Sequence, residues 1–541
     1  MLDASTPNSV LDVVVSQSRR VLETYRVDPK LIEEHANGER RIHQGGYGDR
    51  QIYELAQNGA DELRDDPGGE ICVVLTSTYL YCANQGAPMT AEGADTILRM
   101  GVSRKRAGQI GRFGVGVKSV LSVSDAPEFY SNSGCFGFDR DWATNRIQSV
   151  HPDATEIPVL RMARALDRDR SAAADPILSE LLDWAITVVR LPLKPDAVPR
   201  LARDLHNFPA EFPLFSEHVG TVTLEDRRST PFYRRVISQM VQGDRHTIQE
   251  ERTVESDRTS HWRVFTRSFR PSPQALNAAG ELHNRPEIDI SWAVPTKSRR
   301  IRELGTFWAY FPTNYNTLLR GILNAPWKTS EDRQNLYRGN AFNDELIVEA
   351  ARLIVTSLPE LVSSDDPAGY IDLLPGRGKE APQWADRQLT NAIWATIARH
   401  PSLPDQTGVL RRPEQLHLHP DGLAEAWLSQ WSSYSGCPTE WCHHSVQNRD
   451  RRARTERIFQ EAGRPIASVR QWLEALVIDG SPAASSAAIR IVAEMIESRH
   501  HLRDEALKAR IVLTESDQIV APDRADVFRR STNDALDDGL V

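Results

Sequence analysis

An acid, an amide and a second acid recur at helical spacing in the segment 51–64, Gln-Ile-Tyr-Glu-Leu-Ala-Gln-Asn-Gly-Ala-Asp-Glu-Leu-Arg. Glu54, Asn58 and Asp61 stand at positions i, i+4 and i+7, so they share one face of the predicted helix. The amide can give Mg²⁺ one oxygen ligand, and the first carboxylate can take a proton from water. The alternative is an ordinary amphipathic helix whose polar face is solvated.

A glycine-rich stretch at 110–119, Ile-Gly-Arg-Phe-Gly-Val-Gly-Val-Lys-Ser, is typical of a loop that holds phosphate. Gly111, Gly114 and Gly116 allow the backbone to approach an anion closely, and Lys118 follows them. Val117 separates the last glycine from the lysine, so the P-loop pattern fails by one residue, and the dinucleotide fingerprint fails too. A tight turn before a core helix is the alternative.

Two strands are predicted between these motifs, over 71–82, with a short turn joining them. They lead into a turn at 83–90, which Gly86 and Pro88 mark. Asn84 directly follows the second strand and is expected to present its amide at the floor of a pocket.

Taken together, the three motifs resemble the GHKL ATPases, which include gyrase, the 90-kilodalton heat-shock chaperones, histidine kinases and the MutL proteins. The order matches the family's N box, turn and glycine-rich lid. The runs 46–63 and 110–131 most resemble the sacsin-type, heat-shock-chaperone-like branch. The resemblance implies a Bergerat-type α/β sandwich that binds ATP with Mg²⁺.

The resemblance also implies roles for individual residues. Glu54 would be the general base, Asn58 the Mg²⁺ ligand, and Asp61 a support for the base side of the pocket. The family usually has aspartate where this chain has Asn84, which removes a charge-assisted hydrogen bond to adenine worth about 1 kcal/mol and leaves base preference open. The other residues implied to bind nucleotide are Gly86, the lid residues Gly111, Arg112, Phe113, Gly114, Val115, Gly116 and Lys118, and the strand residue Thr187.

A second candidate lies in 323–336, Leu-Asn-Ala-Pro-Trp-Lys-Thr-Ser-Glu-Asp-Arg-Gln-Asn-Leu. In GHKL proteins the domain after the ATPase domain sends a basic loop to the γ-phosphate, and this segment is similar in position and type. Lys328 and Arg333 are the candidate cations, since a cation there stabilises charge on the transferring phosphoryl oxygens. A basic surface loop is the alternative.

The 541 residues are expected to form an α+β protein with three regions: a nucleotide domain at 1–195, an α/β transducer-like middle domain at 196–345, and a mainly helical region at 346–541. A helix is expected to open at Leu11, and helices at 156–183 precede the Thr187 strand. Two short segments, 408–414 and 518–523, echo each other as small β-turn modules. Strands are predicted at 219–224, 261–266, 288–294 and 307–311, and later helices at 343–358, 385–399, 465–476 and 485–498.

The composition limits the possible partners and compartment. A net charge of −9 argues against a general nucleic-acid-binding surface. Five cysteines in a chain of this length indicate no disulfide framework, and no apolar run approaches the roughly 18 residues of a membrane span. The expected location is therefore the cytoplasm. Cys437, Cys442, His443 and His444 lack the second ligand pair that zinc needs. The basic stretch from Arg449 to Arg457 is interpreted as a solvated helix face, with phosphate contact as the alternative.

Two functions are consistent with these motifs. The first is an ATP-hydrolysing switch that closes its lid over nucleotide and forms an ATP-dependent homodimer, as its relatives do. The second is a nucleotide-gated module that binds protein or nucleic acid and hydrolyses little or no ATP. A protein client or a second component of an anti-phage defence system is the expected partner.

Overall fold

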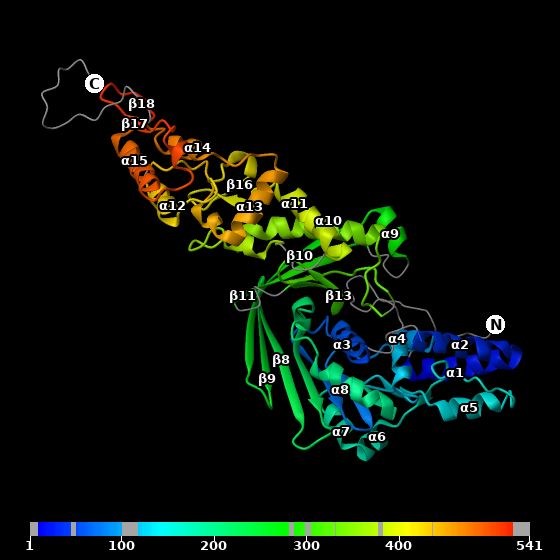
Figure 1. Ribbon diagram of the computed structural model, residues 1–541. Coiled ribbons are helices and arrows are strands. Elements are labelled where there is room, and N and C mark those ends of the chain that lie inside the picture. Colours follow the sequence, from blue (N-terminus) through cyan, green and yellow to red (C-terminus); the bar gives the residue numbers. More distant parts are fainter. Residues whose placement is uncertain are drawn as a thin grey trace, which may run out of the picture. The chain divides into compact units, whose positions relative to one another are not determined.

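The computed structural model describes residues 9–44, 50–99, 117–280, 286–297, 304–330, 332–376, 382–434 and 436–522. The chain divides into two units, coloured along the sequence in Figure 1. The first contains Met1–Thr317, Gly321–Ala350 and Gln383–Ala385, and the second contains Leu318–Arg320, Ala351–Pro382 and Asp386–Val541. The regions predicted at 1–195 and 196–345 therefore both lie in the first unit.

One mixed sheet runs through the first unit, in the order β13-β12-β14-β11-β10-β9-β8-β7-β1-β2-β6-β3-β4-β5. Its centre is the antiparallel pair β1 and β2, with β7 parallel to β1. The strands are β1 (Gly69–Leu75), β2 (Tyr79–Asn84), β3 (Glu128–Ser131), β4 (Gly134–Gly137), β5 (Arg164–Ala165), β6 (Thr187–Pro192), β7 (Val219–Asp226), β8 (Tyr233–Gln242), β9 (Arg245–Arg252), β10 (Arg258–Phe269), β11 (Ile288–Lys297), β12 (Gly305–Trp308), β13 (Pro312–Thr317) and β14 (Ile322–Asn324).

Alternating side chains on β1 bury both faces of this sheet. Ile71 and Val73 join the core that contains the apolar residues of α3 and α8, whereas Cys72 and Val74 pack with α7 (Figure 1). Helices therefore cover both sides of the central strands. The helices of the first unit are α1 (Val10–Val27), α2 (Lys30–Gln44), α3 (Gln51–Glu62), α4 (Ala91–Leu98), α5 (Arg140–Gln148), α6 (Arg168–Ala174), α7 (Pro176–Leu182), α8 (Val198–His206) and α9 (Pro273–Ala279).

The structure confirms the strands predicted over 71–82 and the helix predicted from Leu11. The prediction of helices throughout 156–183 is wrong for its first part. Residues 157–163 form no helix because buried side chains bind their backbone: Glu39 accepts hydrogen bonds from Val159 and Leu160, and Ser18 bonds both backbone groups of Ala163. Only α6 and α7 are helical there.

The second unit is mainly helical around a core of tryptophans. Trp431 and Trp472 stack at 5.7 Å between ring centroids, within a cluster that also includes Leu473, Ile491 and Met495. The segments 408–414 and 518–523 each contain the second strand of a hairpin, β15 (Leu403–Pro404) with β16 (Leu410–Arg411) and β17 (Val512–Leu513) with β18 (Ile519–Val520). Helix α10 (Ala341–Ser357) begins in the first unit; the helices that follow it are α11 (Trp384–Ile397), α12 (Glu425–Ser432), α13 (Arg449–Glu461), α14 (Val469–Leu476), α15 (Pro482–Glu497) and α16 (Arg503–Ala506).

No helix among the described residues combines the length and the apolar character that a bilayer crossing requires.

Candidate functional site

Helix α3 carries two of its acidic residues, Glu54 and Asp61, into the interior. Glu54 is only 4% exposed and Asp61 is also buried, whereas Asn58, one turn after Glu54, is half-buried. The interpretation of this face as solvated is therefore wrong for both acids. Since a buried carboxylate is costly unless it is paired, the surroundings of Glu54 decide what it can do.

Arg333 is the partner of Glu54. Its Nη2 donates to Glu54 Oε2 at 3.0 Å and its Nη1 donates to Gln57 Oε1 at 2.5 Å. Arg333 is 3% exposed. Its φ of 56° places its backbone in the left-handed region, which residues other than glycine rarely occupy. The turn after residue 330 is thus shaped to direct this guanidinium at α3.

A second arginine stands at the start of the same helix. Arg50 is buried, contacts the Tyr53 ring at 5.3 Å, and donates from Nη1 to the Asp332 carbonyl at 3.3 Å. Burial, with the nearby charge of Arg333, lowers the pKa of Arg50 to about 10, and the Glu54 carboxylate opposes that shift. The base candidate therefore lies in a field of two guanidinium groups.

Lys328 occupies a different place. Its Nζ donates to the Ala279 carbonyl at 3.0 Å, and its backbone N–H donates to Asn343 Oδ1 at 2.7 Å. Of the two cations predicted from 323–336, Arg333 is the one that the structure brings to Glu54.

Three polar residues on neighbouring strands line up in register beside α3. Asn84 of β2 lies opposite Thr187 of β6, which lies opposite Ser131 of β3. Thr187 Oγ1 donates to Ser131 Oγ at 3.2 Å, and Asn84 Oδ1 accepts from the Gly86 N–H at 3.1 Å. Both Asn84 and Thr187, predicted as parts of one pocket, are therefore neighbours.

Gly86 lets the turn after β2 approach the end of α3. A Cβ at Gly86 would lie 2.5 Å from backbone atoms of Glu62, and the Ala87 N–H donates to the Glu62 carbonyl at 2.9 Å. Only glycine fits this approach without movement of the turn. The turn thereby holds Asn84 close to the helix that carries Asn58.

The predicted lid lies outside the described residues. This applies to Gly111, Arg112, Phe113, Gly114, Val115 and Gly116. Lys118 lies within the short helix η2 (Val117–Ser122), and its side chain also lies outside the described part.

Sequence reasoning missed Gln57 and Arg50. Gln57 follows Glu54 by three residues, so helical spacing places it on the same face, and this signal was available. Arg50 precedes the helix, and nothing in its local sequence indicates that it contacts Asp332.

The basic stretch in α13 is mostly bound to the second unit itself, so its interpretation as a solvated face is wrong for its central residues. Arg451 Nη2 pairs with Asp366 and Asp372 at 2.7 and 2.8 Å, Arg452 is buried, and Arg454 donates to the Leu374 carbonyl. Among the described residues, no group of three or more His, Cys, Asp or Glu is arranged to hold a metal ion.

No protein-family model matches the chain. A stretch of 91 residues, 16% of this chain, is 35% identical to Protein NO VEIN of Arabidopsis thaliana. The chain spans 3% of the length of that relative.

Proposed function

We propose that the first unit is a GHKL-type ATPase that binds ATP with Mg²⁺ and uses hydrolysis to change its conformation. The contact between Arg333 and Glu54 carries this proposal. The two residues are 279 positions apart, yet both are buried and their side chains meet. A cation and an acid that can position water are recurring parts of phosphoryl-transfer sites, and this contact brings one of each together.

The described residues fit ATP and Mg²⁺. Asn58 offers an amide oxygen at a half-buried position on the face that carries Glu54, and Mg²⁺ prefers such oxygen ligands beside phosphates. Asn84 and Thr187 offer polar groups at the floor of the proposed adenine pocket. The amide oxygen of Asn84 already accepts from Gly86, and its second lone pair can still accept from an adenine amino group.

Each residue then has a separate task. Asn58 would ligate Mg²⁺, which when bound neutralises charge on the phosphate oxygens. Glu54 accepts a proton from the attacking water, which requires that its carboxylate exchange Arg333 for that water. Arg333, once released, stabilises the charge that spreads over the transferring phosphoryl oxygens.

This exchange would make the site a switch. Without nucleotide the guanidinium holds the base, and with nucleotide it moves to the phosphate, so the 323–336 loop reports the state of the site. Lid closure and dimerisation, which the GHKL resemblance implies, would follow from the same change.

The direct test is phosphate release and ATP binding by the full chain. We expect Glu54→Gln to bind Mg²⁺–ATP but to release phosphate at least about 100-fold more slowly, since the general base is lost. Asn58→Ala should lose Mg²⁺-dependent binding. Asp65→Asn, an exposed acid just after α3, is the matched control and should behave as the unchanged protein. Unchanged turnover in Glu54→Gln would refute the mechanism.

A second candidate function is a nucleotide-gated binding module with little hydrolysis. The observation that favours it is the engagement of Glu54 by Arg333, because a base held by a buried guanidinium is not free to activate water. Tight ATP binding with no phosphate release in the unchanged protein would select this function over the ATPase.

A further inference from the structure

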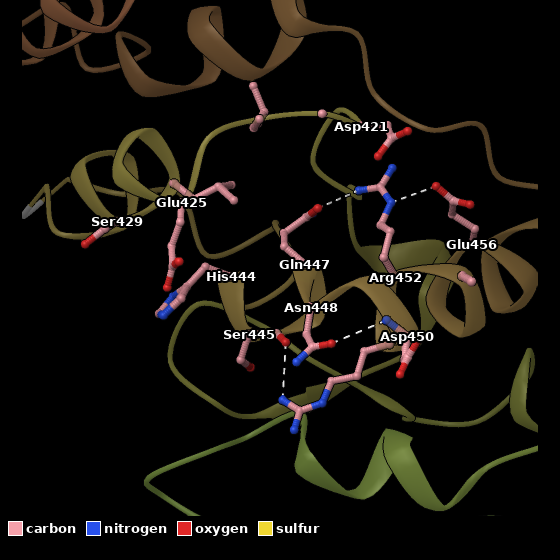
Figure 2. Close-up of a pocket in the computed structure, with 15 residues that line it drawn as sticks. Asp421, Glu425, Ser429, His444, Ser445, Gln447, Asn448, Asp450, Arg452 and Glu456 are labelled. Carbon is pink, nitrogen blue, oxygen red and sulfur yellow. Dashed lines mark hydrogen bonds and ion pairs between the residues drawn. The ribbon is translucent and has the colours of Figure 1, made fainter. Parts of the chain in front are cut away.

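The second unit contains a cavity of about 940 Å³, within the size range of ligand sites. It lies among α12, the short helix η10 (His444–Gln447) and the first turns of α13 (Figure 2). All its lining residues belong to this unit, so the cavity is independent of the nucleotide site.

Two donors in the wall of this cavity have no acceptor. Arg452 is 5% exposed; its Nε donates to Glu456 at 2.7 Å and its Nη1 donates to the His419 carbonyl and to Gln447 Oε1. Figure 2 shows its guanidinium between Gln447 and Glu456. Arg452 Nη2 and Gln447 Nε2 are buried without a hydrogen-bond partner. Because buried donors are normally paired, each of these two groups has a hydrogen bond still to give, which an acceptor on a bound molecule or a water molecule can take.

Three exposed carboxylates also line this cavity. Asp421, Glu425 and Asp450 line the cavity, and none forms an ion pair with another residue in the described part of the chain. Arg451 cannot offset their charge because it is bound to Asp366 and Asp372. Burial lowers the pKa of His444, although the charge of Glu425 opposes this shift. The outer part of the cavity is therefore negative.

The same lining includes an apolar wall of Leu423 and Leu428. The aliphatic stem of a lysine or arginine can pack on such a wall while its charged end reaches acidic groups. An anion fits poorly, since Glu456 already neutralises Arg452 and three further carboxylates repel it. A polyamine fits poorly too, because it has no acceptor for Arg452 and Gln447.

We propose that this cavity binds a protein segment that contains lysine or arginine. A backbone carbonyl of the segment accepts from Arg452 Nη2 and Gln447 Nε2, and its cationic side chain lies against Asp421, Glu425 and Asp450. The second unit would thus recognise a partner protein.

A displayed library of random dodecapeptides, selected on the full chain, tests this proposal. We expect selected sequences to be enriched in lysine and arginine. Their affinity, measured by fluorescence anisotropy, should fall at least about tenfold on the triple variant Asp421→Asn, Glu425→Gln, Asp450→Asn. All three residues are exposed, so the variant is expected to fold normally, which circular dichroism checks.

A control variant separates this site from general charge attraction. Glu440→Gln, Glu497→Gln and Glu505→Gln together remove three exposed acids of the same unit that do not line the cavity, and should leave affinity unchanged. No enrichment of basic residues, or equal loss in both triple variants, would overturn the proposal. Displacement of the peptide by inorganic phosphate would identify an anion site instead, and displacement by spermidine at equal concentration would identify nonspecific polycation binding.

Discussion

Glu54 and Arg333 form a buried pair whose members depend on each other. Arg333→Ala should lower the free energy of unfolding by about 3–5 kcal/mol, because it leaves a carboxylate buried without its partner. Adding Glu54→Gln should recover part of this loss, with a coupling energy of about 1–3 kcal/mol in a double-mutant cycle. Urea unfolding of the four proteins measures it. Additive single effects would show that the pair is not coupled.

Asn84 decides how strongly the proposed pocket can hold adenine. Asn84→Asp should tighten ATP binding about fivefold, since a carboxylate accepts from the adenine amino group about 1 kcal/mol more strongly than an amide. The Gly86 N–H, which donates a hydrogen bond to the Asn84 amide oxygen, can donate equally well to the new carboxylate. Calorimetric titration with ATP measures the gain, and GTP, which has a carbonyl where adenine has its amino group, should gain nothing. A parallel gain for GTP would contradict this role.

Sequence alone identified the parts of the site that are local in the chain. Glu54 and Asn58 could be placed on one helix face because helical spacing depends only on neighbouring positions. The sequence favoured Lys328 over Arg333 and could not show which of them meets Glu54, since this depends on the left-handed turn that directs Arg333 at a helix 279 positions away. The charges on α13 misled for the same reason: the partners of Arg451 are acids 79 and 85 positions distant.

The turn after β2 packs against the end of α3 and so holds the sheet next to this helix. Gly86→Ala should cost about 1–3 kcal/mol of unfolding free energy and weaken ATP binding, because the new methyl group must push the turn away from Glu62. Gly93→Ala, in the first turn of α4, is the control and should cost less, since the nearest contact is a side-chain atom, the Thr90 hydroxyl at 3.3 Å, and not backbone. Equal effects of the two variants would remove the special role of the turn.

Glu39 ties α2 to the segment 157–163 and makes this connection sensitive to pH. Burial raises the pKa of Glu39 from its ordinary 4.5 to about 7, although two backbone N–H groups and the charges of Arg140 and Arg161 oppose the shift. The folded state therefore binds a proton more readily than the unfolded state. As pH rises from about 4.5 to 7, deprotonation of Glu39 should therefore lower the free energy of unfolding by about 3 kcal/mol.

The variant Glu39→Gln tests this pH dependence by its slope. It should remove the decrease between about pH 4.5 and 7, even if the lost acceptor lowers stability at every pH. Urea unfolding from pH 5 to 8 measures the slope, and Glu33→Gln, an exposed acid on the same helix, should keep it. An unchanged slope in Glu39→Gln would mean that Glu39 does not titrate in this range.

Periodic sequence patterns predicted which helices and strands exist better than the residues at which they begin and end. The strand predicted at 307–311 ends at Trp308, because Tyr310 adopts a positive φ of 65° that interrupts extended backbone. The loop at 157–163 contains Pro158, a local signal against a helix that the prediction from the alanine and arginine content of 156–183 overlooked. Its conformation depends on Ser18 and Glu39, more than 100 positions away, which no local pattern shows.

At the scale of the whole molecule, the two units have separate cores and separate candidate sites. Apolar residues of α3 and the central strands form one core, and the tryptophans around α12 and α14 belong to another. The proposed nucleotide site and the proposed peptide site therefore lie in different units. The sequence places the start of a mainly helical region at residue 346, where helical patterns replace the strand patterns that precede it.

Nucleotide should therefore stabilise the two units unequally. In scanning calorimetry of the full chain, Mg²⁺–ATP at about 100 times its dissociation constant should stabilise the first unit by about 2.7 kcal/mol and raise only its transition, because ligand linkage acts on the unit that binds. Gly86→Ala identifies this transition by lowering it in the absence of nucleotide. Removal of Mg²⁺ with EDTA should abolish the increase, as should Asn58→Ala, since each removes one part of the proposed Mg²⁺ site. A matching rise of the second transition would show that nucleotide acts on both units together, and an increase that persists in EDTA would exclude Asn58 as a metal ligand.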